Sequence, residues 1–110
     1  MEIITTNEHC IITPLTPKIN SGDIQRLNAE INTIKGKKIG LDLRYVKDCT
    51  ADFLNELKNW GNIGLFNIHS DIFTALSFMN LDKVLKIYVS ELDFVENKRQ
   101  ILNRNLRVLG

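Results

Sequence analysis

The sequence contains few of the residues that mark specialised classes of protein. It has only two cysteines and two prolines, and no apolar run approaches the roughly 20 residues that a membrane-spanning helix needs. Its 14 lysines and arginines nearly balance 13 aspartates and glutamates, which leaves a formal net charge of +1. This balance gives no electrostatic reason to expect nucleic acid or an anionic membrane as a partner. We therefore expect no nucleic-acid binding and no direct membrane insertion.

The scarcity of cysteine also bears on the expected compartment. The N-terminal stretch MEIITTNEH lacks the basic and then apolar organisation of a signal peptide, so we expect a cytoplasmic protein. In that compartment Cys10 and Cys49 are interpreted as free thiols. With 44% apolar and 25% charged residues, the 110 residues have an ordinary globular composition. We expect one domain over residues 1–110.

Short apolar runs alternate along the chain with segments of helical periodicity. Two β-branched runs flank the polar stretch TNEH and predict a hairpin, which Pro14 and Pro17 end. Ser21, Ser70 and Ser90 are the expected N-caps, and Gly61 and Asn80 are the expected left-handed helix ends. The later strands are predicted at 37–46, 62–68 and 85–89, and the helical segments at 20–36, 53–61, 69–80 and 90–110.

The order of these elements is ββαβαβαβα, which predicts an α/β fold. Strands that alternate with helices imply right-handed crossovers and a mostly parallel sheet with helices packed against it. The opening hairpin adds an antiparallel N-terminal edge strand. In such sheets functional sites favour the loops at the carboxyl ends of strands, where helices begin. The loop DCTA, Asp48 to Ala51, is of this kind, because it separates a predicted strand from a predicted helix.

This loop permits two readings on its chemistry alone. The Thr50 hydroxyl lies in the predicted first turn of a helix, where backbone N–H groups and the helix dipole stabilise a phosphate. A phosphate there adds about −1.5 to −2 charges beside Asp48 and Asp52, which opposes binding to a partner matched to those carboxylates. Alternatively, Asp48 or Thr50 only caps the helix, a contribution of about 1 kcal/mol. Both readings remain open.

Two long stretches carry most of the motifs of this sequence: KKIGLDLRYVKDCTADFLNEL and NIGLFNIHSDIFTALSFMNLDKVLKIYVSELDFV. Together they resemble the STAS domain, a family named for sulfate transporters and anti-sigma factor antagonists. In that family a strand with an apolar-aspartate-apolar pattern leads to a loop Asp-Ser-Ser/Thr-Gly and then to a helix. Here Asp48 matches the loop aspartate and Thr50 the phosphoacceptor, whereas Cys49 and Ala51 depart from the pattern. The resemblance covers essentially the whole chain and lies in the order and spacing of its motifs.

The resemblance implies a bacterial signalling protein that is not an enzyme and needs no cofactor. It would act in transcription regulation as an anti-sigma factor antagonist. Its partner would be an anti-sigma factor that is also a serine/threonine kinase and that phosphorylates Thr50. The expected partner-binding residues are Asp48, Cys49, Thr50, Ala51, Asp52 and Phe53. The family also offers an alternative, in which the same helix docks on the ATPase of a lipid-transport ABC complex without phosphorylation.

Other chemistry has weaker support in the sequence. Cys49 at a helix N-terminus is a candidate redox switch, although no Cys-x-x-Cys spacing is present. His9 is expected in the hairpin turn and His69 just before a helix, and no third ligand accompanies them, so no metal site is predicted. At the C-terminus, Leu106, Val108 and Leu109 are candidates for packing against a second copy, as in a homodimer, or against a partner.

Overall fold

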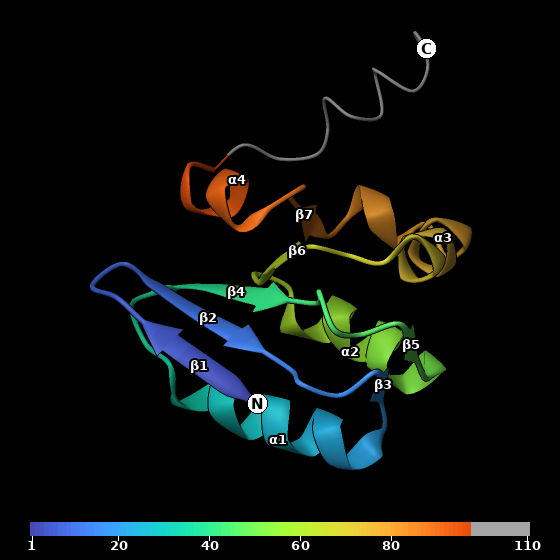
Figure 1. The fold of residues 1–110 in the computed structure, drawn as a ribbon, viewed down its shortest axis with the longest axis horizontal. Helices are drawn as coiled ribbons and strands as arrows, with labels where there is room; N and C mark the ends of the chain where they lie inside the picture. The colour runs from blue at the N-terminus through green and yellow to red at the C-terminus, as the bar shows by residue number, and fades with distance from the viewer. Residues whose placement is uncertain (98–110) are drawn as a thin grey trace, which may run out of the picture.

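A computed structural model describes residues 1–97 and contains a five-stranded sheet in the order β1-β2-β4-β6-β7. β1 pairs antiparallel with β2, and all the later neighbours in the sheet are parallel. The predicted α/β fold, with a mostly parallel sheet and an antiparallel N-terminal pair, is therefore confirmed (Figure 1). The strands are β1 (Glu2–Thr5), β2 (His9–Thr13), β4 (Lys38–Asp42), β6 (Gly64–Phe66) and β7 (Lys86–Ile87).

Helices cover both faces of this sheet. They are α1 (Ser21–Thr33), α2 (Ala51–Trp60), α3 (Ser70–Phe78) and α4 (Glu91–Val95), with a 3₁₀ turn, η1 (Leu81–Lys83), after α3. Figure 1 shows α1 and α2 on one side of the sheet and α4 on the other. Among the described residues, no helix combines the length and the apolar character that crossing a membrane requires.

The alternation of side chains along the strands builds two apolar clusters. The larger cluster includes Ile12, Leu41 and Leu65 from three neighbouring strands, together with buried residues of α1, α2 and α3. The smaller cluster lies on the opposite face of the sheet and contains Ile11, Phe66, Tyr88 and Phe94. Because apolar residues are needed on both faces, the central strands have few polar positions, as expected for strands of a parallel sheet.

Phe94 holds the short helix α4 against the second face. Gly40 and Gly64 are partners in the β4–β6 register. A Cβ atom at either position would lie within 2.7 Å of the Phe94 ring. The same ring stacks on Phe66 at a centroid distance of 5.2 Å and meets Tyr88 edge-on at 5.4 Å. The two glycines therefore provide the space that lets an aromatic side chain approach the backbone of the sheet.

The helix caps partly follow the sequence prediction. Ser90 is the N-cap of α4, and Asn80 has the left-handed backbone expected of it, with φ 58. The predicted caps Ser21 and Ser70 are wrong by one residue. Asn20 caps α1 by accepting a hydrogen bond from Asp23 N–H, and His69 caps α3 by accepting one from Asp71 N–H. In both cases the preceding side chain has a free acceptor, so the serine is already the first helical residue.

Two features of the termini also differ from the predictions. His9 is not a turn residue but the first residue of β2, and its ring meets Phe94 edge-on at 5.7 Å. The long last helix is confirmed only at its start, because α4 ends at Val95. Glu96 and Asn97 form a turn where the prediction had helix, and Asn97 has the left-handed backbone, with φ 63. The rest of that prediction, including the apolar residues Leu106, Val108 and Leu109, lies at 98–110, outside the described residues.

A second, very small sheet was not expected from the sequence. β3 (Lys18–Ile19) pairs in parallel with β5 (Asp48–Cys49). Next to this pair, the carbonyl oxygen of Pro17 accepts hydrogen bonds from the N–H groups of Lys47 and Asp48, at 2.8 and 3.0 Å. The segment before α1 is thereby attached to the loop before α2, and the DCTA stretch has a defined backbone.

Candidate functional site

Thr50 is the N-cap of α2. Its backbone is extended, with φ −84 and ψ 162, and its hydroxyl oxygen accepts a hydrogen bond from Phe53 N–H at 3.3 Å. The residue is half-buried. The hydroxyl therefore lies where the first unpaired N–H groups of the helix are found, as the sequence predicts for both a capping and a phosphoacceptor role.

Asp48 is an exposed carboxylate on the neighbouring strand. One of its oxygens accepts a hydrogen bond from Cys49 N–H at 2.8 Å, and the other lies 3.7 Å from the ammonium group of Lys18. Both side chains of this ion pair are more than 60% exposed, so water screens the pair and it contributes little stability. Asp48 is thus accessible to a partner.

Cys49 has a different environment from its two neighbours in the loop. It is half-buried and packs against the larger apolar cluster. Burial, followed by the charge of Asp48, raises the pKa of the Cys49 thiol. The thiolate is the reactive form of cysteine, so this environment disfavours the redox chemistry considered for Cys49. Both Cys10 and Cys49 are free thiols.

The remaining three predicted contact residues divide between surface and core. Ala51 and Asp52 are exposed on the first turn of α2. Phe53 is fully buried, and its ring meets Trp60 edge-on at a centroid distance of 6.2 Å. Phe53 cannot therefore form part of a contact surface in this structure. Its role is to attach the first turn of α2 to the core, because an apolar residue at this spacing faces the sheet.

A shallow groove between α1 and α2 extends the surface around Asp52. Its volume is about 350 Å³. Polar side chains dominate the lining, among them Gln25 and Asn28 of α1 and Asn55 and Glu56 of α2. Asn28 also accepts a hydrogen bond from the indole N–H of Trp60 at 3.0 Å, which fixes the two helices relative to each other. The sequence carries no signal for this groove, because it depends on how two separate helices pack.

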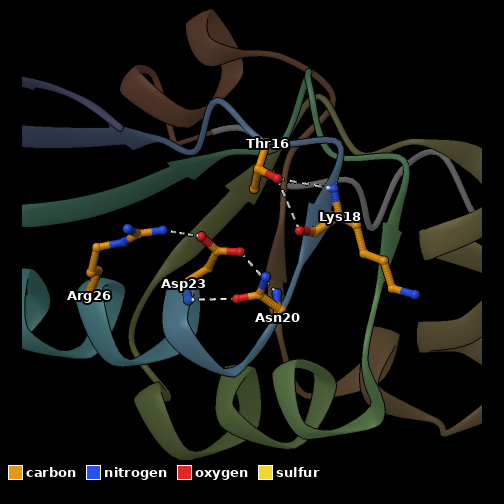
Figure 2. A network of polar contacts seen from close by, with 5 residues as sticks. All are labelled: Thr16, Lys18, Asn20, Asp23 and Arg26. Atoms are coloured by element: carbon orange, nitrogen blue, oxygen red, sulfur yellow. Dashed lines mark hydrogen bonds and ion pairs between the residues drawn. The ribbon is translucent and has the colours of Figure 1, made fainter.

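A hydrogen-bonded network positions the strand beside Asp48. Figure 2 shows Asn20 and Asp23 in a reciprocal capping box at the start of α1, with the Asp23 carboxylate also contacting Arg26. Thr16 Oγ1 interacts with the backbone N–H and C=O of Lys18, at 3.4 and 3.1 Å. These contacts fix β3, and β3 in turn pairs with β5. The start of α1 and the start of α2 are thereby held at one edge of the molecule.

A second polar cluster stabilises the path from β4 to the loop. Asp42 is 2% exposed at the carboxyl end of β4 and accepts hydrogen bonds from Arg44 Nε at 2.8 Å and from Asn67 Nδ2 at 3.1 Å. The hydrogen bond to Asp42, and then the charge of that carboxylate, raise the pKa of Arg44. Because the buried charge is paired and hydrogen-bonded, it specifies the turn at Leu43 to Val46. In the sequence, this cluster is indicated by Asp42, the one polar residue within the apolar stretch LDL.

Arg44 also borders an open cleft at the carboxyl ends of β4 and β6. The cleft is lined by Arg44, Asn67, Ser90, Glu91 and Leu92. The Arg44 guanidinium is shared between Asp42 and, at 3.9 Å, Glu91. Its charge is thus already balanced within the chain. We therefore assign the cleft no ligand and place the candidate site at the start of α2.

Metal binding and similarity to known proteins give no further information about this site. Across residues 1–97, no three histidine, cysteine or acidic side chains lie close enough together to bind a metal ion. No protein-family model matches the chain, and no curated protein matches it in sequence. Membership of the STAS family therefore stays a prediction.

Proposed function

We propose that this chain is a non-enzymatic regulatory binding module of the anti-sigma factor antagonist type, switched by phosphorylation of Thr50. Its partner is an anti-sigma factor with serine/threonine kinase activity, and the regulated process is transcription. The proposal depends on one observation above all. The hydroxyl of the half-buried residue Thr50 caps α2 between two accessible carboxylates, Asp48 and Asp52.

In the unmodified protein the start of α2 offers a surface that suits a partner with basic residues. Asp48 and Asp52 provide negative charge, and Glu56 continues it one turn further along α2. The groove beside them adds the amide groups of Gln25 and Asn28 from α1. Charged groups at such a surface contribute mainly to specificity and to the rate of association.

Phosphorylation changes this surface without requiring a rearrangement of the fold. The kinase transfers the γ-phosphoryl group of ATP to Thr50 Oγ1, which releases ADP and the hydroxyl proton. The new oxygens lie at the N-terminus of α2, where unpaired N–H groups and the helix dipole stabilise them. About −1.5 to −2 charges are added beside Asp48 and Asp52, so a partner matched to two carboxylates meets an excess of negative charge.

The test is the intact mass of the purified chain after incubation with ATP and a lysate of its source organism. We expect the wild type to gain one phosphate and Thr50→Ala to gain none. Thr50→Ser keeps a hydroxyl at the same position and should still be modified. Thr74→Ala is the matched control, because Thr74 is an exposed threonine on α3, away from the start of a helix.

A phosphate that persists in Thr50→Ala would place the modification elsewhere and contradict the proposal. Absence of any gain, in a lysate shown to be active on a control substrate, would also contradict it. That result would favour the alternative of constitutive docking on a transporter ATPase, for which co-purification with the membrane fraction is the next measurement. Thr50→Ala must be folded for the comparison, and losing the cap is expected to cost only about 1 kcal/mol.

A further inference from the structure

The outer edge of β1 is open. β1 is the first strand in the order β1-β2-β4-β6-β7, and none of the described residues pairs with its outer side. Its side chains are exposed, including Ile3 at 40% and Ile4 at 55%. Edge strands usually carry lysine, proline or a bulge that discourages pairing with another strand. β1 has no such feature, because its register with β2 is continuous and its only charge is Glu2.

The ladder between β1 and β2 shows which backbone groups face outward. The N–H of Thr6 donates to the carbonyl oxygen of His9 at 2.8 Å. Antiparallel strands alternate between hydrogen-bonded and non-hydrogen-bonded pairs, so Ile4 also bonds to β2, whereas Ile3 and Thr5 do not. The N–H and C=O groups of Ile3 and Thr5 therefore point to the open edge. They can bond to a further strand without any change in the sheet.

A groove accompanies this edge on the side of the sheet that faces α1. Figure 1 shows β1 along the border of the sheet with α1 beside it. The groove has a volume of about 500 Å³, and apolar surface predominates in its lining. The residues that bear on its occupant are Met1, Ile3, Arg26, Leu27 and Glu30. A strand added to β1 would therefore place alternate side chains over this groove.

The charges along the groove indicate which occupant fits. Arg26 and Glu30 lie one turn apart on α1 and line the groove together with Ile3. A two-fold axis perpendicular to the sheet, placed between Ile3 and its copy, would make both β1 and α1 antiparallel to their copies. That arrangement would pair Arg26 of each copy with Glu30 of the other, so the charges are complementary, as a symmetric interface requires. Arg26 contacts Asp23 but its side chain is 70% exposed and is accessible to a second carboxylate.

We propose that two copies of this chain associate by antiparallel pairing of their β1 strands, with the two α1 helices side by side beneath the joined sheet. The backbone groups of Ile3 and Thr5 provide the hydrogen bonds of the seam. The apolar side chains along the groove are buried between the copies. Arg26 and Glu30 determine the register. This proposal is independent of any modification at Thr50.

Sedimentation velocity over micromolar to near-millimolar concentrations tests the proposal on the full chain. We expect the wild type to shift from the mass of one chain to that of two. Ile3→Lys should weaken association by roughly tenfold or more, because it places two like charges beside each other at the seam. Phe78→Lys is the control, since Phe78 is 88% exposed on α3 and should leave association unchanged.

A charge exchange tests the self-complementarity directly. Arg26→Glu and Glu30→Arg should each weaken association, and the double variant Arg26→Glu with Glu30→Arg should restore it. These three charge variants test the proposed dimer even if Ile3→Lys fails to fold. Circular dichroism would show such a loss of folding. A wild type that stays monomeric at every concentration overturns the proposal. So does a dimer that Phe78→Lys dissolves, or one whose single charge reversals are not rescued by the double variant.

Discussion

At the scale of single residues, the three successive side chains of Asp48, Cys49 and Thr50 have three different environments. The carboxylate is exposed, the thiol is half-buried against the core, and the hydroxyl caps a helix. Adjacent positions at the end of a strand face opposite sides, so such a contrast is expected. The consequence is that the accessible chemistry of this loop belongs to Asp48 and Thr50, while Cys49 contributes packing.

The pKa of Cys49 yields a prediction at this scale. Because burial and the Asp48 charge raise it, a smaller fraction of Cys49 than of a free thiol is thiolate at neutral pH. We expect iodoacetamide to modify Cys49 in the folded protein more slowly than a free cysteine peptide at pH 7.5. The rate should continue to rise at pH values where the peptide has already reached its plateau. Cys10→Ser removes the second thiol, and Asp48→Asn should increase the rate slightly.

Reactivity above that of the free peptide would contradict this prediction and revive the redox switch. Loss of folding at high pH is excluded by following the far-ultraviolet circular dichroism over the same range. The sign of the effect is fixed by the direction of the shift. A raised pKa means that the folded protein retains the thiol proton at pH values where the unfolded chain has lost it.

At the scale of elements, α4 depends on one aromatic side chain and two glycines. Gly64→Ala would place a methyl group 2.6 Å from the Phe94 ring, so we expect a loss of about 1–3 kcal/mol in the free energy of unfolding. Gly22→Ala is the matched control, because the nearest atom to its Cβ would be 3.4 Å away and alanine favours a helix. Urea denaturation measures both. Equal stability of the two variants would show that Phe94 does not occupy this space.

Lys38 adds a polar contact to the attachment of α4. Its ammonium group donates to the Phe94 carbonyl oxygen at 2.6 Å and lies 4.5 Å from the centroid of the same ring. A cation at the C-terminal end of a helix is favourable for the dipole as well. A helix of only five residues would not be stable alone, so tertiary contacts of this kind must supply its stability.

At the scale of the whole molecule, the sequence predicted the order and class of the elements because their signals are local. Periodicity identified α1 to α3, and runs such as GLF identified buried strands. β3 and β5 escaped detection because two residues are too few to show alternation. The caps Asn20 and His69 could not be predicted by residue type, because the serine after each of them is as good a cap as asparagine and a better one than histidine.

The candidate site was predictable in its position but not in its surroundings. Asp48 and Thr50 followed from their place between a strand and a helix. The burial of Phe53 and the groove beside Asp52 depend on how α1 and α2 pack together, which no single segment encodes. The open edge of β1 likewise depends on sheet order, and a hairpin sequence does not state which of its strands lies outside.

The carbonyl oxygen of Pro17 accepts two hydrogen bonds, so a displacement of the DCTA loop can be observed by hydrogen exchange. Lys47 and Asp48 both donate their N–H groups to that one carbonyl, so these two amides should exchange together and more slowly than the neighbouring surface amides. Separation of β3 from β5 would release both at once. A kinase, a phosphate or a docked partner that displaces the loop should therefore appear as a paired change in two amide protons. Independent exchange of the two amides would show that the shared carbonyl does not hold them.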